Sequence, residues 1–317
     1  MKVWVHTLTH LATDILGVDL RPMPGESLPA FTAGAHIDVH LSNGMVRSYS
    51  LSNDPKESHR YVLGVLKDPQ SRGGSSHLHQ HWRIGQTLEI SAPRNHFELN
   101  LAEAVAHTVL VAGGIGITPL LSMARTLQGL GRSYEMIYCG KRREAMAFLD
   151  DIQGLVPNLH VHADDEQGAF PDLHALFKQR GWSESTHLYA CGPGPFLDAF
   201  LSACDQVGLA HAHIERFSAQ PVKASEDAQS TYELVLQRSG RTLTVEPNQR
   251  LLDAIRLAGV EVITSCEEGI CGSCETRVLS GEPDHRDSVL TAAERASNQV
   301  MMVCVSGCKS PRLVLDA

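Results

Sequence analysis

The sequence lacks three features that mark whole classes of protein. It has no long apolar run, and the N-terminal stretch MKVWVHTLTHLATDILGVDL is interrupted where a signal peptide or membrane helix needs an unbroken apolar core. It has no excess of basic charge, since 27 Lys and Arg stand against 36 Asp and Glu, giving a formal net charge of −9. It also contains no internal repeat. We therefore expect a cytoplasmic protein that binds neither membrane nor nucleic acid, and whose protein partner carries a basic patch.

The length and the cysteine content limit the remaining possibilities. A chain of 317 residues exceeds the size of one ordinary hydrophobic core, so we expect two or three domains. Hydrophobic residues make up 43% and charged residues 20%, as in soluble globular proteins. Five of the eight cysteines follow Cys204. In a reducing compartment, clustered cysteines are metal ligands or catalytic groups rather than disulfides.

The hydrophobic pattern changes twice along the chain. Up to about Leu99 it consists of short alternating runs such as HIDVHLSNGMVRSYSLSNDP and YVLGVLKDP, which predict an antiparallel barrel. From His107 strand-like runs such as TVLVAG and YEMIYCG alternate with helical segments such as TPLLSMARTLQGLG. This alternation predicts a parallel α/β sheet with its ligands at the carboxyl ends of the strands.

A polar stretch, SAQPVKASEDAQS, then reads as a linker. After it come two strands, YELVLQRSG and RTLTVEP, and a short helix, RLLDAIRLAG. We therefore predict a barrel domain at 1–102, a parallel α/β domain at 103–218, a linker at 219–230 and a third domain at 231–317.

Three cysteines fall within nine positions of the stretch TSCEEGICGSC. Cys266, Cys271 and Cys274 fit C-x4-C-x2-C, and Cys304 follows after 29 intervening residues. This is the plant-type [2Fe–2S] spacing, in which four thiolates hold two irons. The small residues of the loop permit positive φ angles and backbone N–H groups that turn towards the sulfurs. Zinc would more often show two separated pairs of ligands, and inert core cysteines need no spacing at all. Cys308 competes as fourth ligand; we assign Cys304 and expect Cys308 to be a free thiol.

Two stretches of the first domain suggest a planar anionic ligand. In RSYSLSNDP, Arg47 and Tyr49 alternate on one strand and share a surface with Gly64, so that a guanidinium can meet a phosphate and a ring can stack. A solvated strand explains the same alternation. In SRGGSSH, a Gly-Gly-Ser turn can cradle a phosphate or be an ordinary loop.

Two glycine loops of the second domain suggest a dinucleotide. In LVAGGIGITPLLSMA, glycines let the backbone approach a pyrophosphate at the helix that begins near Thr118, although Pro119 stands where a strict G-x-G-x-x-G has its third glycine. A tight βα turn explains the loop equally well. In YACGPGPFLDAF, Cys191 ends a strand, as a site residue or as a plain buried cysteine.

Together these motifs resemble the phthalate dioxygenase reductase family, which includes vanillate demethylase reductases. The order of R-x-Y-S, G-G-I-G-I-T-P, C-G-P, E-R-F and C-x4-C-x2-C is the family's, and the similarity extends to GEPDHRD and MVCVSGCKSPRLVLD at the C-terminus. The resemblance implies an antiparallel β-barrel flavin domain, an α/β parallel-sheet nucleotide domain and an α+β plant-type ferredoxin domain of the β-grasp type. Leu66 departs from the family, which often has a basic residue there, and so does the second C-terminal cysteine, Cys308.

The resemblance also implies the cofactors and their contacts. It implies FMN, NADH and a [2Fe–2S] cluster, with Ser50 and Thr118 positioning flavin N5, Cys191 beside the nicotinamide and Glu215 orienting it. A surface charge at a strand end is an equal reading of Glu215. The implied flavin contacts are Arg47, Ser48, Tyr49, Ser50, Gly64, Val65, Gly74, Ser75 and Phe217. The implied nucleotide contacts are Gly113, Gly114, Gly116, Thr118, Pro119, Cys191, Gly192 and Pro193.

The implied function is electron transfer from NADH through FMN and the cluster to a Rieske-type aromatic-ring oxygenase or O-demethylase of aromatic catabolism, which docks at the ferredoxin domain of a monomer. The acidic residues Glu267, Glu268 and Glu275 predict an acidic docking rim. The alternatives are a reductase for a cytochrome P450 or a non-Rieske monooxygenase, a redox sensor and a zinc-stabilised binding module. NADPH is the alternative donor, because GKRRE at 140–144 places basic residues where a 2′-phosphate can lie.

Overall fold

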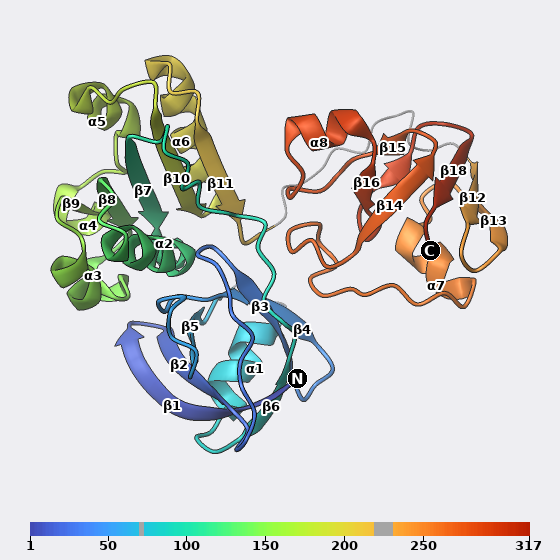
Figure 1. Cartoon of the computed structure of the whole chain (residues 1–317), viewed down its shortest axis with the longest axis horizontal. Helices are drawn as coiled ribbons and strands as arrows, with labels where there is room; N and C mark the ends of the chain where they lie inside the picture. The colour runs from blue at the N-terminus through green and yellow to red at the C-terminus, as the bar shows by residue number, and fades with distance from the viewer. Residues whose placement is uncertain (70–72, 219–230) are drawn as a thin grey trace. The chain divides into compact units, whose positions relative to one another are not determined.

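The computed structural model describes residues 1–69, 73–218 and 231–317 (Figure 1). The chain divides into two compact units, Met1–Phe217 and Ser218–Ala317. The predicted linker at 219–230 lies outside the described residues, as do the first two residues of the predicted SRGGSSH turn. Among the described residues, no helix combines the length and the apolar character that crossing a membrane requires.

An antiparallel six-stranded barrel forms the first part of the N-terminal unit, as predicted. Its strands run in the order β4-β3-β6-β1-β2-β5. An isolated bridge between Leu51 and Leu63 joins the two edges and closes the sheet. Alternate residues such as Val5, Ile37 and Leu63 are fully buried inside it. The strands are β1 (Lys2–Ala12), β2 (Ile15–Pro22), β3 (His36–His40), β4 (Val46–Ser50), β5 (Tyr61–Leu66) and β6 (Thr87–Ile90).

One helix of the barrel, α1 (Gly74–His81), was not predicted. It begins directly after Gly73, whose φ is 98°, and Leu78 is its one fully buried apolar side chain. Glycines and serines at its start resemble a turn, and a single buried leucine gives no helical periodicity. The helix therefore depends on the packing of Leu78 into the barrel core rather than on its own sequence.

A parallel five-stranded sheet forms the rest of the N-terminal unit, in the order β11-β10-β7-β8-β9. Its strands are β7 (His107–Gly113), β8 (Tyr134–Gly140), β9 (Leu159–Ala163), β10 (Thr186–Gly192) and β11 (Ala212–Arg216). Helices α2 (Ile117–Gly129) and α3 (Leu149–Leu155) pack on one face, and α5 (Leu173–Arg180) and α6 (Gly194–Val207) pack on the other. The short segments are η1 (Gly114–Gly116), η2 (Arg143–Ala145) and α4 (Asp164–Gln167). The βαβ alternation is thus confirmed.

The C-terminal unit is a mixed sheet covered by one helix. The strands run in the order β13-β12-β18-β14-β16, with β12 and β18 parallel and the other pairs antiparallel. Buried residues of α7 (Leu251–Leu257) pack against this sheet. The strands are β12 (Tyr232–Leu236), β13 (Arg241–Val245), β14 (Glu275–Ser280), β16 (Val300–Met302) and β18 (Arg312–Leu315). A small ladder joins β15 (Pro283–Asp284) to β17 (Gly307–Cys308), and α8 (Ala292–Ser297) precedes β16.

Three histidines stack where β10 and β11 begin, on the strands whose other ends carry Cys191 and Glu215. The rings of His187 and His211 lie 4.3 Å apart, and Nδ1 of His187 lies 3.1 Å from Nε2 of His213. Burial, with the neighbouring His187 and His211, lowers the pKa of His213 to about 4. His213 therefore remains neutral at a pH where an exposed histidine is already protonated.

We expect acid to weaken the N-terminal unit through this stack. Because the pKa of His213 is lower in the folded state, the unfolded chain binds the proton first, and stability is lost as the pH falls from about 6.5 to about 4. The free energy of unfolding should fall between pH 7 and pH 5, and replacing His213 by Gln should make this fall smaller by on the order of 1 kcal/mol. Urea unfolding at both pH values measures it, with His10→Gln as exposed control. Equal losses in His213→Gln and the wild type would contradict this role.

Candidate functional site

Residues far apart in the sequence meet where the barrel adjoins the carboxyl ends of the parallel strands. Gly64 of β5 faces the start of α2 so closely that an added Cβ would lie 2.7 Å from Cγ2 of Thr118. Ser50 at the end of β4 donates its hydroxyl proton to Oε2 of Glu215 at 3.4 Å. Four of the predicted site residues thus come together within the N-terminal unit.

The carboxyl of Glu215 is the centre of this meeting point. Register between the parallel strands β10 and β11 places it beside Cys191, whose Sγ lies 4.0 Å from Oε2. Burial raises the pKa of Glu215 to about 8, while the hydrogen bond from Ser50 opposes this change. Burial and the adjacent carboxylate raise the pKa of the Cys191 thiol well above its usual value. Cys191 is therefore a neutral thiol, and Glu215 exchanges a proton near neutral pH.

The two predicted glycine loops pack against each other. A Cβ on Gly116 would lie 2.1 Å from the carbonyl oxygen of Cys191, so only glycine fits this contact. A Cβ on Gly113 or Gly192 would meet the ring of Phe196 at 2.9 Å. Gly114 has a φ of 56° and open space where its Cβ would be. Helices α2 and α6 begin in these loops, so their positive ends lie at the same edge, as a bound pyrophosphate requires.

Thr118 and Pro119 lie in the first turn of α2 and are buried. The hydroxyl of Thr118 donates to the carbonyl of Ile115 at 3.0 Å. This hydroxyl therefore remains available only as an acceptor, and its methyl group is the part that faces Gly64. The predicted role of Thr118 in positioning flavin N5 stays a prediction, as does that of Ser50, which is also buried and donates its hydroxyl proton to Glu215.

Arg47 and the start of α1 form a cationic cradle. The guanidinium lies against Gly74, where an added Cβ would be 2.5 Å from Nε, and Nη1 donates to the carbonyl of Val46 at 2.8 Å. Burial raises the pKa of Tyr49 to about 12, with the nearby Arg47 charge opposing it. A cation, helix amides and an aromatic side chain together suit a phosphate joined to a planar ring. The arrangement therefore fits a flavin nucleotide.

Three predicted flavin contacts have other surroundings. Ser48 donates its hydroxyl proton to Oδ1 of Asp38 at 2.7 Å, since successive residues of β4 face opposite sides. Val65 is fully buried in the barrel, and its carbonyl lies 2.9 Å from Nε2 of His79. Phe217, the last residue of the N-terminal unit, is 39% exposed. Ser75 accepts a hydrogen bond from the amide of Asp68 at 3.2 Å and remains at the cradle.

Phe148 belongs to the site but was not predicted to do so. Its sequence, in AMAFLDD, resembles the interior of a helix, yet α3 begins only at Leu149. Phe148 itself has a φ of 62°, a costly conformation for a bulky residue, and its ring would lie 3.1 Å from a Cβ on Gly64. One sequence holds no signal for such a contact, because it depends on how the barrel meets the sheet.

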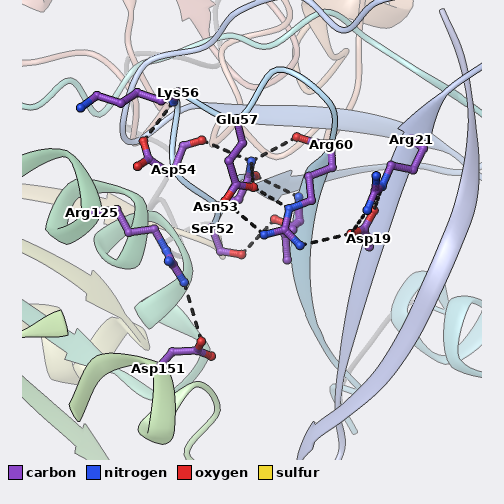
Figure 2. Close-up of polar contacts among 11 residues, drawn as sticks. Asp19, Arg21, Ser52, Asn53, Asp54, Lys56, Glu57, Arg60, Arg125 and Asp151 are labelled. Carbon is purple, nitrogen blue, oxygen red and sulfur yellow. Dashed lines mark hydrogen bonds and ion pairs between the residues drawn. The ribbon is translucent and has the colours of Figure 1, made fainter. Parts of the chain in front are cut away.

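A hollow of about 400 Å³, apart from this site, lies on the outer side of β1 and β2, facing α2 and α3. Arg60 lies between Asp19 at 3.3 Å and Glu57 at 2.5 Å, and Arg125 faces Asp151 at 3.8 Å. Figure 2 shows these arginines turned towards the carboxylates. Among the described residues that line the hollow, none belongs to the predicted site. Because its charges are paired, we interpret this network as a structural contact rather than a binding site.

Four buried cysteines form the second candidate site, in the C-terminal unit. The amide of Glu268 donates to Sγ of Cys266 at 3.3 Å, and the amide of Cys266 donates to Sγ of Cys271 at 3.5 Å. Ser273 Oγ lies 3.1 Å from Sγ of Cys271. The loop turns at Gly269 and Gly272, whose φ angles are 69° and 72°. Amides aimed at sulfur stabilise thiolates, so the loop suits metal coordination.

The four thiols lie in two pairs. Contact with Cys271 raises the pKa of Cys266, and contact with Cys274 raises that of Cys304. Among the described residues, no three His, Cys, Asp or Glu side chains converge as they would around a single metal ion. Two irons held by two thiolates each need only pairs, whereas tetrahedral zinc needs all four around one point. The donor set thus fits a [2Fe–2S] cluster.

Cys308 has a different neighbourhood. It lies on β17, which pairs with β15, and its Sγ lies 3.2 Å from the carbonyl of Ser310. A second carbonyl, of Arg312, lies at 3.9 Å. Cys308 thus contacts the C-terminal segment, which favours Cys304 as the fourth ligand.

Known proteins match both units. Residues 234–309 match the family of the 2Fe-2S iron-sulfur cluster binding domain. The chain is 44% identical to phenoxybenzoate dioxygenase subunit beta of Ectopseudomonas oleovorans, covering 98% of this chain and 96% of the relative. Among solved structures, an intact type IV self-sufficient cytochrome P450 monooxygenase matches with a TM-score of 0.91 and 39% identity, over 100% of this chain and 41% of that one.

Another solved structure, phthalate dioxygenase reductase, matches over nearly its whole length. The TM-score is 0.70 and the identity 38%, and the match covers 100% of this chain and 98% of that one. This similarity confirms the resemblance drawn from the motifs. The chain therefore belongs to the family of oxidoreductases that includes phthalate dioxygenase reductase.

Proposed function

We propose that the chain is an NADH-dependent reductase component that passes electrons through FMN and a [2Fe–2S] cluster to a Rieske-type aromatic-ring oxygenase or O-demethylase. The observation that carries this proposal is the meeting of Ser50, Cys191 and Glu215. The same chain also holds four free cysteines that contact one another in two pairs. A flavin held here would supply hydride acceptance from a nicotinamide and one-electron release to a [2Fe–2S] cluster. The side chains and loops of the protein hold the flavin and the nicotinamide in position.

The barrel at 1–102 binds the flavin and the α/β part at 103–218 binds the nucleotide. Arg47 and the amides of α1 hold the flavin phosphate, and Tyr49 packs on the ring. The loops around Gly116 and Cys191 hold the nucleotide, and Glu215 orients the nicotinamide. Ser50 would exchange its hydrogen bond to Glu215 for one to the flavin edge, and Glu215 would hold or release a proton next to it. These roles rest on the geometry of the cradle and the loops.

NADH is the proposed donor, because the arginines of GKRRE are already paired. Arg143 binds Glu166 at 2.5 Å, and Arg142 binds Glu144 at 2.8 Å. A 2′-phosphate would have to displace these carboxylates. Equal or better kcat/KM with NADPH would contradict the choice. FMN is proposed over FAD because of the resemblance to the phthalate dioxygenase reductase family, and chromatography of the released flavin tests it.

The partner docks at the C-terminal unit of a cytoplasmic monomer. Leu257 and Ile263 are the most exposed large apolar side chains among the described residues, at 80% and 77%, and both belong to the stretch that leads from the end of α7 to the cysteine loop. Of the predicted acidic rim, Glu267 is ion-paired with Arg256 at 2.6 Å and with Arg250 at 3.5 Å, whereas Glu275 is exposed at the start of β14. Raising the salt concentration should slow transfer to the partner more than it slows flavin reduction. Equal effects would contradict this docking mode.

Reconstitution tests the function as a whole. We expect NADH to reduce the flavin and cluster anaerobically, and a Rieske-type oxygenase supplied with this protein to form product in proportion to NADH consumed. A flavin that NADH cannot reduce would overturn the proposal. A cytochrome P450 is the alternative acceptor, favoured by the match to a self-sufficient P450 monooxygenase. Product formed only with a P450 partner would select it.

A further inference from the structure

The cysteine loop is attached to helix α7 by an arginine pair. Oε1 of Glu267, the residue after Cys266, lies 2.6 Å from Nη2 of Arg256 at the end of α7. Oε2 of the same carboxylate lies 3.5 Å from Nη2 of Arg250, the residue before α7. The same Arg256 nitrogen lies 3.0 Å from Oγ1 of Thr264, ahead of the cysteines. One carboxylate thus lies between two guanidinium groups from opposite ends of one helix.

One of these two arginines also contacts the chain segment that carries the fourth cysteine. Nη2 of Arg250 donates to the carbonyl oxygen of Cys304 at 3.3 Å. Arg250 therefore contacts both the loop that holds three of the cysteines and the strand end that holds the fourth. Contacts to two ligand segments fix the distance between them, as outer-shell groups do at other metal sites.

The backbone of Glu267 supports a specific role for this carboxylate. Its φ is 54°, one of five positive values at non-glycine residues among the described residues. Such a conformation costs about 1 kcal/mol or more and persists only where other contacts impose it. The ion pairs with Arg256 and Arg250 are contacts of this kind.

We propose that Arg250, Glu267 and Arg256 form a charge clamp that positions the two ligand segments and sets the reduction potential of the [2Fe–2S] cluster. This inference rests on the cluster of the proposed function. The clamp carries a net charge of about +1, from two guanidinium groups and one carboxylate. Reduction adds one negative charge to the cluster, so a nearby positive charge favours the reduced form.

The sign of each substitution separates this role from a purely structural one. Glu267→Gln removes a negative charge and should raise the equilibrium constant for one-electron reduction about fivefold, or about 40 mV. Arg250→Gln removes a positive charge and should lower it by a similar factor. A side chain that only holds the loop in place would change the potential in the same direction in both variants, because both loosen the same contact.

The experiment is a redox titration of the purified full-length protein, followed by the cluster's EPR signal. Arg238→Gln is the matched control, since Arg238 pairs with Asp316 on the surface of the same unit at 2.7 Å. Arg250→Lys retains the charge without the fork, so its potential should remain near the wild-type value while the cluster is lost faster from the oxidised protein.

Opposite shifts in Glu267→Gln and Arg250→Gln, with none in Arg238→Gln, would establish the clamp. Shifts of the same sign, or none, would overturn it. If Arg250→Gln cannot retain a cluster, the comparison of Glu267→Gln with Arg250→Lys decides: a raised potential in the first and an unchanged one in the second is required. A wild-type protein without iron and sulfide would instead overturn the proposed function itself.

Discussion

Replacing Cys304 by serine is expected to remove the cluster's visible absorption and abolish electron transfer to a protein acceptor. Cys304 forms one of the two thiol pairs, with Cys274, and is 2% exposed. A serine there offers a weak oxygen ligand in place of a thiolate, and one iron loses half of its protein ligands. NADH should still reduce the flavin at the wild-type rate, because that site is built entirely from the N-terminal unit.

Cys308→Ser is the control for this prediction, since Cys308 is equally buried but contacts the carbonyl of Ser310. We expect this variant to retain its iron, sulfide and electron transfer. Absorption spectra, iron analysis and anaerobic stopped-flow reduction by NADH measure all three properties. If Cys308→Ser lost the cluster and Cys304→Ser retained it, the ligand assignment would be wrong.

Patterns local in sequence were sufficient for most of the architecture. Alternating runs predicted the barrel because β-strands expose every second residue, and the structure confirms it. Helical and strand-like runs in alternation predicted the parallel sheet in the same way. The cysteine spacing needed no tertiary information either, since three ligands share one loop. Such features depend only on residues close together along the chain.

Features that depend on tertiary contact could not be predicted. Helix α1 has a turn-like start and a single buried leucine, and it forms because the barrel packs around it. Phe148 belongs to the site because its ring lies close to Gly64, which is 84 positions away in the sequence. The sequence predicts Glu267 as part of an acidic rim, whereas Arg250 before α7 and Arg256 within it neutralise this carboxylate. A charge in a sequence does not reveal its partner, so counts of acidic residues overestimate an acidic surface.

Gly116→Ala is expected to lower kcat/KM for NADH at least tenfold while leaving flavin binding intact. The added Cβ would lie 2.1 Å from the carbonyl oxygen of Cys191 and 2.7 Å from the amide nitrogen of Gly192. Both are backbone atoms, so the two nucleotide loops must separate. Overpacking of this kind costs about 1–3 kcal/mol, and a shift of an ångström at a reacting centre can reduce rates a hundredfold.

The matched control is Gly154→Ala in α3, where no atom lies within 4 Å of the added Cβ. It should raise the stability by about 0.5–1 kcal/mol, because alanine favours the helix, and leave kcat/KM unchanged. Stopped-flow flavin reduction at varied NADH concentration, with thermal unfolding of each variant, separates the two effects. The flavin should remain bound in Gly116→Ala, since Arg47 and α1 belong to the barrel. Wild-type kcat/KM in Gly116→Ala would show that NADH does not bind between these loops, and the nucleotide site would have to be placed elsewhere.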